Sequence, residues 1–452
     1  MAINGIFSAL SGMNAHRAML DTAAHNVTNQ LTPGYRRQVV DVAPANIGSG
    51  PQVFTGPGSR VTGVEVIDTR RVLDQAAESR AQRSVAAAVD ASTTHSSMTR
   101  IEDVFGEPTE NGIAAQLDTF FVSWSGLADR ADDTVARTEV LSQASSLADR
   151  FRQVDRDLTN IDADANTRLG TMASEINLLA SQVADLNRSI ATNPTAANSL
   201  MDERDRLASE LVGMAGAEVR ESDRGQVAVS IGGRLLVGNG ASYDVRQDGS
   251  GLVWDVGGGA LRPGPSELAS LNQLRNETIP SVRTQLDTVV SDLVTEVNSA
   301  HRQGYDLNGT TGLDFFDAAG TTAATLALSA DVIDQPDRLA AGAPALPGPT
   351  APGLYDGGQA QLLGDLSATG TADSGYRSLV AGLGVDTNAA GRRATSSQQI
   401  ADRALDQAES VSGVSLDEEL ATMMAAQRGF EASARVLNIV DDMLQTVIGM
   451  IR

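Results

Sequence analysis

Apolar residues recur every three or four positions near the start of the chain and again along its middle, a spacing typical of amphipathic helices. The first stripe runs from Ile6 to Val27 and predicts a helix over residues 4–29. This helix is expected to end at Thr32-Pro33-Gly34, because proline cannot continue a helix and glycine supplies the turn. A longer stripe with a heptad repeat and one slip runs from Leu147 to Ile190. It predicts a rod-like helix of roughly 65 Å that packs along its length, as in a coiled coil.

The pattern changes between these helical stretches. Short β-like pieces are expected at 39–42 and 61–67, and residues 217–256 alternate apolar and polar positions around glycine pairs typical of hairpins. This predicts a small antiparallel β unit. Asn193-Pro194 is expected to interrupt the rod, and residues 340–358 read as an Ala/Gly/Pro-rich loop. Further helices are expected at 73–105, 117–128 and 202–214 and from Ser266 onward.

The last helix carries two neighbouring apolar stripes, so apolar residues cover much of its circumference. One partner within the chain, the N-terminal helix, can cover only part of that surface. Exposed apolar surface of this size usually marks a site of association. The two terminal helices are therefore expected to pair antiparallel and to present a subunit interface, with two arginines beyond the first turn making polar contacts to neighbours or standing in solvent. The predicted interface residues are Ile6, Leu10, Met13, Leu20, Val27, Tyr35, Arg36, Arg37, Leu416, Leu420, Met423, Phe430, Val436, Leu437, Val440, Leu444, Val447, Ile448 and Ile451.

These elements predict a mainly α fold with small β units, in which both N- and C-terminal segments form an elongated long-helix bundle with an inserted antiparallel β domain. The predicted division is residues 1–40 as the N-terminal helix of an inner axial domain, 41–215 as a long-helix rod, 216–262 as the β domain, 263–316 as a returning rod helix, 317–392 as a loop-rich segment, and 393–452 as C-terminal helices that complete the rod and the inner domain.

Composition narrows the function. The 452 residues hold 57 Asp and Glu against 34 cations, all arginine, for a formal charge of −23, which argues against nucleic acid as a partner. With neither lysine nor cysteine, the chain lacks a phosphate-binding lysine, a Schiff-base lysine and a thiolate nucleophile. The sequence shows no apolar run long enough to span a membrane, and no cleavable signal peptide is expected at its start, so export would use a route that cleaves none.

Candidate chemistry is sparse. The four histidines, His16, His25, His95 and His301, lack metal-ligand spacing, and hydrogen-bonding or solvated roles are expected for them. The segment 306–314 resembles part of a calcium loop but lacks its glycine and glutamate positions, so a turn is the preferred interpretation. The acidic run 417–419 follows Ser415 and is expected to cap a helix. The sequence therefore predicts no catalytic, cofactor-binding or metal residue.

Several motifs are shared with a known protein family. The segments Asn26-Val27-Thr28-Asn29 and Thr32 to Arg37 resemble the N-terminal signature of bacterial flagellar rod, hook and hook-associated proteins. The closing helix from Ser412 and the internal segments are similar to the hook-associated protein 1 family, the first hook–filament junction proteins, in collinear order over nearly the whole chain. The internal segments are 105–108, 120–128, Ala136-Arg137, 202–205, 298–309 and 314–316.

The resemblance implies a non-enzymatic adaptor of the bacterial flagellum that joins hook to filament and is required for filament assembly and motility. It implies an extracellular, secreted protein that passes through the flagellar export apparatus. Its expected partners are further copies of itself in a ring-like or helical assembly, hook protein, the second hook-associated junction protein, and an export chaperone at the C-terminal helix, with no membrane insertion. Larger members carry an outer domain after 314–316 that is expected to be reduced here. Another axial protein of rod or hook type, a cytosolic coiled-coil scaffold, and an enzyme with an unrecognised site remain open.

Overall fold

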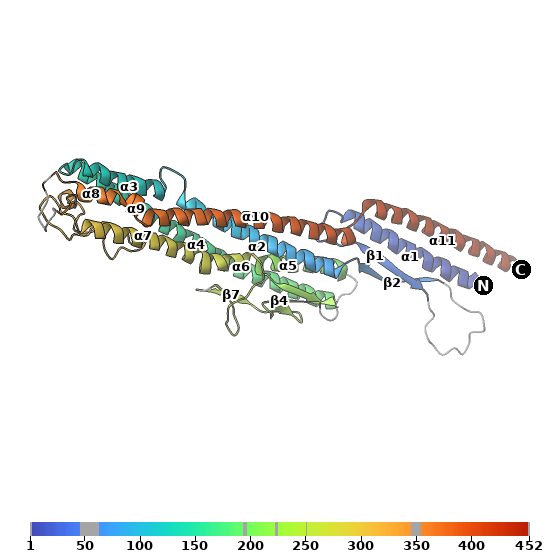
Figure 1. Ribbon diagram of the computed structural model, residues 1–452. Helices are drawn as coiled ribbons and strands as arrows, with labels where there is room; N and C mark the ends of the chain where they lie inside the picture. Colours follow the sequence, from blue (N-terminus) through green and yellow to red (C-terminus); the bar gives the residue numbers. More distant parts are fainter. Residues whose placement is uncertain are drawn as a thin grey trace.

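The chain folds into an elongated rod of helices with both termini at one end (Figure 1). The computed structural model describes residues 2–45, 63–192, 197–221, 225–249, 251–344, 353 and 355–450, and the side chains of residues 2–4, 447 and 448 lie outside this description. Long helices from the two ends of the chain pack together, and the sheets are small and antiparallel. The predicted fold class is therefore confirmed.

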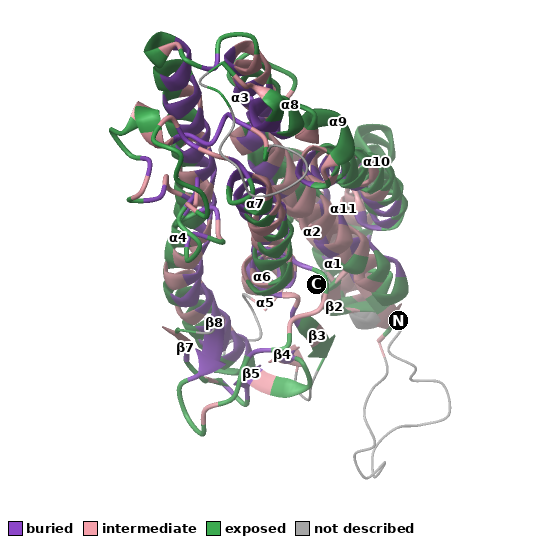
Figure 2. Cartoon of the chain, turned by 60° about the vertical axis from the view of Figure 1, so that its left-hand side comes forward, coloured by how far each residue is buried: buried purple, intermediate pink, exposed green. Residues whose placement is uncertain are grey.

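The rod is built from α2 (Gln75–Phe105), α4 (Thr134–Thr192), α5 (Ala197–Ala215), α7 (Ile279–His301) and α10 (Ala372–Ser412). The predicted heptad stripe of α4 is buried from Leu147 to Ile190, with Leu186 only partly covered, and buried residues follow α4 along the rod in Figure 2. With 59 residues, α4 spans roughly 90 Å and exceeds the expected length, because the helix begins at Thr134, well before the stripe does. The break predicted at Asn193-Pro194 lies outside the described residues.

Helix α10 corrects one prediction. The segment 317–392 was expected to be rich in loops, yet it contains α8 (Gly358–Gly364), α9 (Leu366–Thr369) and the first half of α10. Gly391 lets α10 approach α2 closely, since a Cβ built there would lie 3.1 Å from the His95 ring. The apolar residues Tyr376, Leu379 and Leu383 provide the buried stripe that holds this half of α10. Part of the predicted 340–358 loop lies outside the described residues.

Two of the remaining elements complete the far end of the rod, namely α3 (Ile113–Ala128) and a short 3₁₀ turn at Pro336–Arg338. Helix α6 (Glu267–Gln273) packs against α2 and α5 nearer the middle of the rod. A π-helical turn, η3 (Leu274–Thr278), joins α6 to α7. Pro280 follows in the first turn of α7 and has no N–H to donate back, which accounts for wider hydrogen bonding just before it.

The strands form three antiparallel sheets. β1 (Gln38–Pro44) pairs with β2 (Val64–Arg71) beside the N-terminal helix α1 (Ala2–Thr28), and the predicted strand residues 61 and 62 lie outside the description. β3 (Glu218–Glu221), β4 (Val227–Ile231), β5 (Arg234–Gly238) and β6 (Ala241–Ser242) follow one another in a four-stranded sheet, and β7 (Val245–Asp248) pairs with β8 (Gly251–Trp254). The β4–β5 hairpin turns at Gly232-Gly233, both with positive φ, as its sequence predicts.

An aromatic cluster forms the core at the end farthest from the termini. Phe120 and Trp124 of α3 contact Phe315 and Phe316, with Trp124 and Phe315 centroids 5.2 Å apart. Asn298 fixes that segment: its side-chain amide donates to the Phe316 carbonyl at 2.9 Å, and its Oδ1 accepts from both phenylalanine backbone N–H groups. The motif residues of 120–128 and 298–316 thus serve to build one core.

Candidate subunit interface

The terminal helices α1 (Ala2–Thr28) and α11 (Leu416–Met450) pack side by side in antiparallel directions (Figure 1). Small residues line their contact. A Cβ built at Gly12 would lie 3.0 Å from Ser433 Oγ, and one at Gly5 would lie 3.2 Å from Val440 Cγ2. The His16 ring lies so close to Gly429 that any Cβ there would overlap it. These pairs step along the two helices in opposite directions, which fixes the register.

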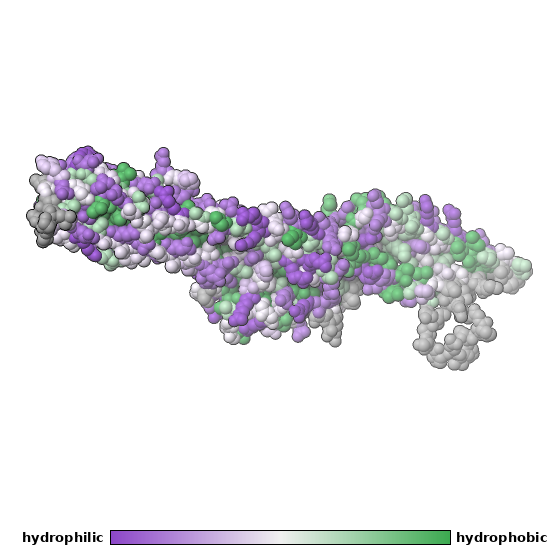
Figure 3. All heavy atoms as spheres, viewed as in Figure 1, coloured by the Kyte–Doolittle hydropathy of each residue, from purple (hydrophilic) through white to green (hydrophobic). Residues whose placement is uncertain are grey.

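Because small residues bring the two helices close together, large apolar side chains stand outside their contact. The buried residues of the pair are mostly alanines, namely Ala9, Ala15, Ala23 and Ala426, with Val440 among the few large ones. In contrast, Leu420 is 44% exposed, Ile439 56% and Met443 52%. Apolar side chains, coloured green, gather on the visible face of this end of the molecule (Figure 3). The pair therefore presents uncovered apolar surface.

The predicted interface residues divide by burial. Leu10, Leu416, Leu420 and Val436 are exposed, whereas Val440 is buried against α1. The residues partly covered within the chain are Ile6, Met13, Leu20, Val27, Tyr35, Arg36, Arg37, Met423, Phe430, Leu437 and Leu444. The side chains of Val447 and Ile448, and the whole of Ile451, lie outside the description.

Five exposed apolar residues of the pair lie outside the predicted interface set: Phe7, Met424, Ile439, Met443 and Met450. A signal was present for three of them. Met424 follows Leu420 by four positions, and Met443 and Met450 continue the second apolar stripe. Leu437 and Leu444 lie instead on the side of α11 that carries Val440 and faces α1.

A polar joint connects the helix pair to the rod. Its centre is Asn26, which is 1% exposed. The Asn26 side-chain amide donates to the Gln38 carbonyl at 2.9 Å and to Glu419 Oε2 at 3.1 Å, and its Oδ1 accepts from the Gln38 N–H at 3.0 Å. The Tyr35 hydroxyl donates to the same Oδ1 at 2.7 Å. These hydrogen bonds fix the positions of the end of α1, the first turn of α11 and the start of β1 relative to one another.

The Tyr35 hydroxyl remains protonated in this joint. Burial raises the pKa of Tyr35 well above its ordinary value, and the nearby carboxylates of Asp202 and Glu419 raise it further. Its one hydrogen goes to Asn26, so the 2.9 Å contact with His25 requires His25 Nδ1 to donate to the Tyr35 oxygen. The motif Asn26 to Tyr35 thus has a local structural role.

Arg36 and Arg37 are held within the chain. Arg36 pairs with Glu78 of α2 at 2.6 Å. Arg37 pairs with Glu419 at 2.7 Å and Glu418 at 3.0 Å, and its backbone N–H donates to the Ser412 carbonyl at 2.9 Å. These intrachain pairs exclude free solvation for both arginines, whereas their contacts to neighbouring subunits stay a prediction. The acidic run 417–419 supplies the first turn of α11, as predicted, and also anchors Arg37.

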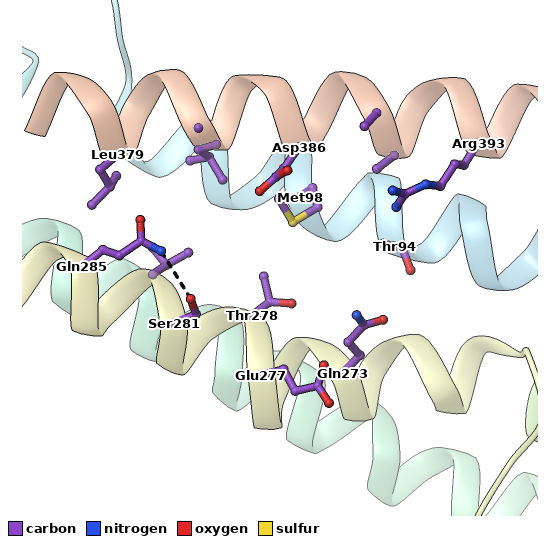
Figure 4. A pocket seen from close by; sticks show the side chains of 15 residues that line it. Thr94, Met98, Gln273, Glu277, Thr278, Ser281, Gln285, Leu379, Asp386 and Arg393 are labelled. Atoms are coloured by element: carbon purple, nitrogen blue, oxygen red, sulfur yellow. Dashed lines mark hydrogen bonds between the residues drawn. The ribbon is translucent and has the colours of Figure 1, made fainter.

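The rest of the described chain offers little chemistry. A groove of about 370 Å³ lies between α2, α10 and the α6–α7 helix; in the close view, Gln285 donates to Ser281 while Glu277 and Asp386 stand on opposite walls (Figure 4). Such a lining lacks a nucleophile next to a base. Asp306 caps a turn by accepting from the Asn308 and Thr310 N–H groups, as the preferred interpretation of 306–314 required.

His301 is wholly buried beside the aromatic cluster, where its Nδ1 lies 2.8 Å from the Leu313 carbonyl and its Nε2 accepts from the Ala340 N–H at 2.9 Å. It therefore has the hydrogen-bonding role that was expected. Among the residues that the structure describes, no group of three or more His, Asp or Glu side chains could hold a metal ion. Within the same residues, no helix combines the length and apolar character needed to cross a bilayer.

Comparisons with known proteins identify this arrangement. A family model described as the C-terminal domain of flagellar basal body rod FlgEFG proteins matches residues 406–450, which defines an axial flagellar protein. A second model, the helical domain of flagellar hook-associated protein FlgK, matches residues 98–316. Together with a Bacillus subtilis relative that aligns over 98% of this chain, this match shows that the chain belongs to the flagellar hook-associated protein 1 (FlgK) family, a family of structural proteins rather than enzymes.

The relatives differ in length. Hook-associated protein 1 of Salmonella typhimurium is 28% identical over 72% of this chain, and the match spans 63% of the relative. The Bacillus subtilis protein is 26% identical, with 98% of this chain and 97% of the relative covered. The solved structure of the flagellar hook junction protein FlgK from Burkholderia pseudomallei has a TM-score of 0.64 at 16% identity and covers 74% of this chain and 100% of the solved one, which supports the fold.

Proposed function

We propose that this chain is a structural adaptor that joins hook to filament at the distal end of the bacterial flagellar hook. Its family places it in the flagellar axial assembly. The observation that carries the proposal is the uncovered apolar surface of the α1/α11 pair, with Leu420 44% exposed and Met424 56% exposed. Burial of one such side chain contributes about 1.5–3 kcal/mol, so several per copy provide a strong drive to associate.

Further copies of the chain cover these apolar faces, and hook protein and the second hook-associated junction protein contact the assembled layer. An export chaperone binds the exposed side of α11 before assembly, because the same residues would otherwise associate too early. Export proceeds through the flagellar apparatus without a cleaved signal peptide. The segment 317–344 supports a reduced outer region, since Leu326, Val332 and Leu339 are buried against the body of the rod end.

Deletion of the gene tests the role. We expect normal hooks, no filaments, loss of swimming, and flagellin released into the medium. Loss of hooks together with filaments would instead indicate a rod or hook protein, and unchanged swimming would refute a flagellar role for this copy.

Two point variants test the surface. Leu420→Asp and Ile439→Asp place a charge on the exposed faces of α11 and are expected to prevent filament formation while leaving the rod folded. Leu178→Asp on α4 is the matched control, since Leu178 is 59% exposed but lies away from the pair. Filaments in both α11 variants would contradict assembly through this surface.

A further inference from the structure

Helix α11 has three distinct faces. Glu419, Ala426 and Val440 are buried toward α1 and define the first. Successive residues of an α-helix are rotated by about 100° around its axis. The exposed apolar residues in the N-terminal half of α11 therefore lie on one flank, about a third of the circumference away from the face toward α1. Those in the C-terminal half lie about as far away on the opposite flank. We name these the N-terminal stripe (Leu416, Leu420, Met424) and the C-terminal stripe (Val436, Ile439, Met443).

The two stripes match each other in spacing. Leu420 and Met424 are separated by four residues, as are Ile439 and Met443, and the offset from one pair to the other is 19 residues. Because the stripes occupy opposite flanks, one copy can present its N-terminal stripe to the C-terminal stripe of a second, parallel copy. This requires a displacement along the helix axis of about 30 Å. A two-fold contact would instead pair a stripe with itself and leave the other bare.

Charged groups agree with this displacement. Asp417 and Arg435 are exposed, and neither forms an ion pair with any described residue. Both lie on the face of α11 opposite α1, 18 residues apart. A shift that places Leu420 beside Ile439 therefore brings Asp417 nearly level with Arg435 of the second copy, with opposite charges at the outer edge of the apolar contact.

We propose that α11 is self-complementary: the N-terminal stripe of one copy packs on the C-terminal stripe of a parallel copy displaced by about 30 Å, with Asp417 facing Arg435. Every copy then contacts two neighbours through different faces, so the contact propagates and does not close as a dimer. The inference rests on the proposed function and adds the register and polarity of the contact.

Cysteine cross-linking tests the register, and the natural chain contributes no thiol. Leu420→Cys and Ile439→Cys chains are co-expressed in the deletion strain, and isolated hook–filament structures are oxidised. We expect a cross-linked dimer only when both variants are present, because a disulfide needs Cα atoms within about 7 Å. Leu420→Cys with Met450→Cys is the control: Met450 shares the flank of Ile439 but lies 11 residues further on, about 16 Å away.

The outcomes separate this proposal from the proposed function. Cross-linking of Ile439→Cys alone would indicate a two-fold contact and overturn the register. Normal filaments without a 420–439 cross-link would overturn it as well, while leaving the adaptor role intact. Failure of the adaptor role itself appears differently, as unchanged swimming of the deletion strain or as loss of its hooks together with its filaments.

A charge exchange tests the ionic contact. Asp417→Arg and Arg435→Asp are each expected to reduce incorporation about fivefold, and the double variant is expected to restore it to within about twofold of the natural chain. Arg220→Asp on β3 is the control, since that side chain is exposed and distant from α11. Additive losses in the double variant would contradict a pairing of these two residues.

Discussion

His301 should make the far end of the rod sensitive to acid. Burial lowers the pKa of His301 from its ordinary value of 6.5 to about 4, despite the backbone hydrogen bond to Leu313 and the carboxylates of Asp314 and Asp306, which favour the charged form. The unfolded chain therefore binds a proton to this side chain between about pH 6.5 and pH 4, whereas the folded chain does not. The contribution of His301 to stability is complete above pH 6.5 and declines as the pH falls through this window.

The magnitude follows from the two pKa values. A difference of about 2.5 corresponds to roughly 3 kcal/mol of unfolding free energy lost between pH 6.5 and pH 4. His301→Gln removes the titrating group while keeping a side chain able to accept from the Ala340 N–H. Its unfolding free energy should consequently fall less steeply with acid than that of the natural chain, whatever its stability at neutral pH.

Trp124 provides a local probe, since its ring centroid lies 6.2 Å from that of His301. The chain has two tryptophans, so a Trp254→Phe background leaves Trp124 as the only one. Urea unfolding followed by its fluorescence at pH 7, 6, 5 and 4.5 gives the two slopes. Carboxylates distant from His301 contribute the same pH dependence to both chains and cancel in the difference. Parallel slopes with and without His301 would refute the assignment of a lowered pKa to this residue.

Three further outcomes are expected. Gly429→Ala should push the His16 ring out of the terminal helix pair and lower the helix content measured by circular dichroism. Gly449→Ala is the control and should leave the helix content unchanged or higher, because a Cβ at Gly449 meets nothing within 4 Å. Equal effects of the two variants would contradict close packing at Gly429. Arg137→Met should lower the free energy of unfolding by about 1–3 kcal/mol in urea titrations, because the buried guanidinium donates to the Ala131 and Leu339 carbonyls at 2.6 and 2.7 Å; an unchanged midpoint would contradict this. Amide exchange in α1 and α11 should be fast in the dilute chain and at least about tenfold slower after assembly, and equal protection in both states would oppose coverage by neighbours.

The sequence was sufficient to predict the long helices, since periodic stripes such as Leu147 to Ile190 report directly which side of a helix is covered. It failed at α10, whose first half falls in the predicted loop-rich segment 317–392 but is helical, with Gly391 admitting the His95 ring of α2. Local propensity cannot distinguish a glycine that bends the chain from one that lets two helices approach, because the second role depends on a residue almost 300 positions away.

The candidate interface shows the same limit. Leu420 is exposed and Val440 is buried because only one side of α11 meets α1. Which side that is depends on small residues such as Gly5 and Gly12 of α1. The intrachain pairs of Arg36 and Arg37 were not predicted, because their partners, Glu78 and Glu419, are distant in the sequence. Pairing across such distances follows from the tertiary fold and not from spacing.

The polar joint has a practical consequence for protein engineering. Residues 35–38 contact the end of α1 through Asn26, α2 through Glu78, the end of α10 through Ser412 and the start of α11 through Glu419. A chimaera that transplants the terminal helices of a relative onto this rod must therefore exchange 26–38 and 412–419 as one unit. A chimaera that exchanged only one of these two segments would combine polar joint residues from two different proteins. The transplanted helices would then have no defined angle to the rod.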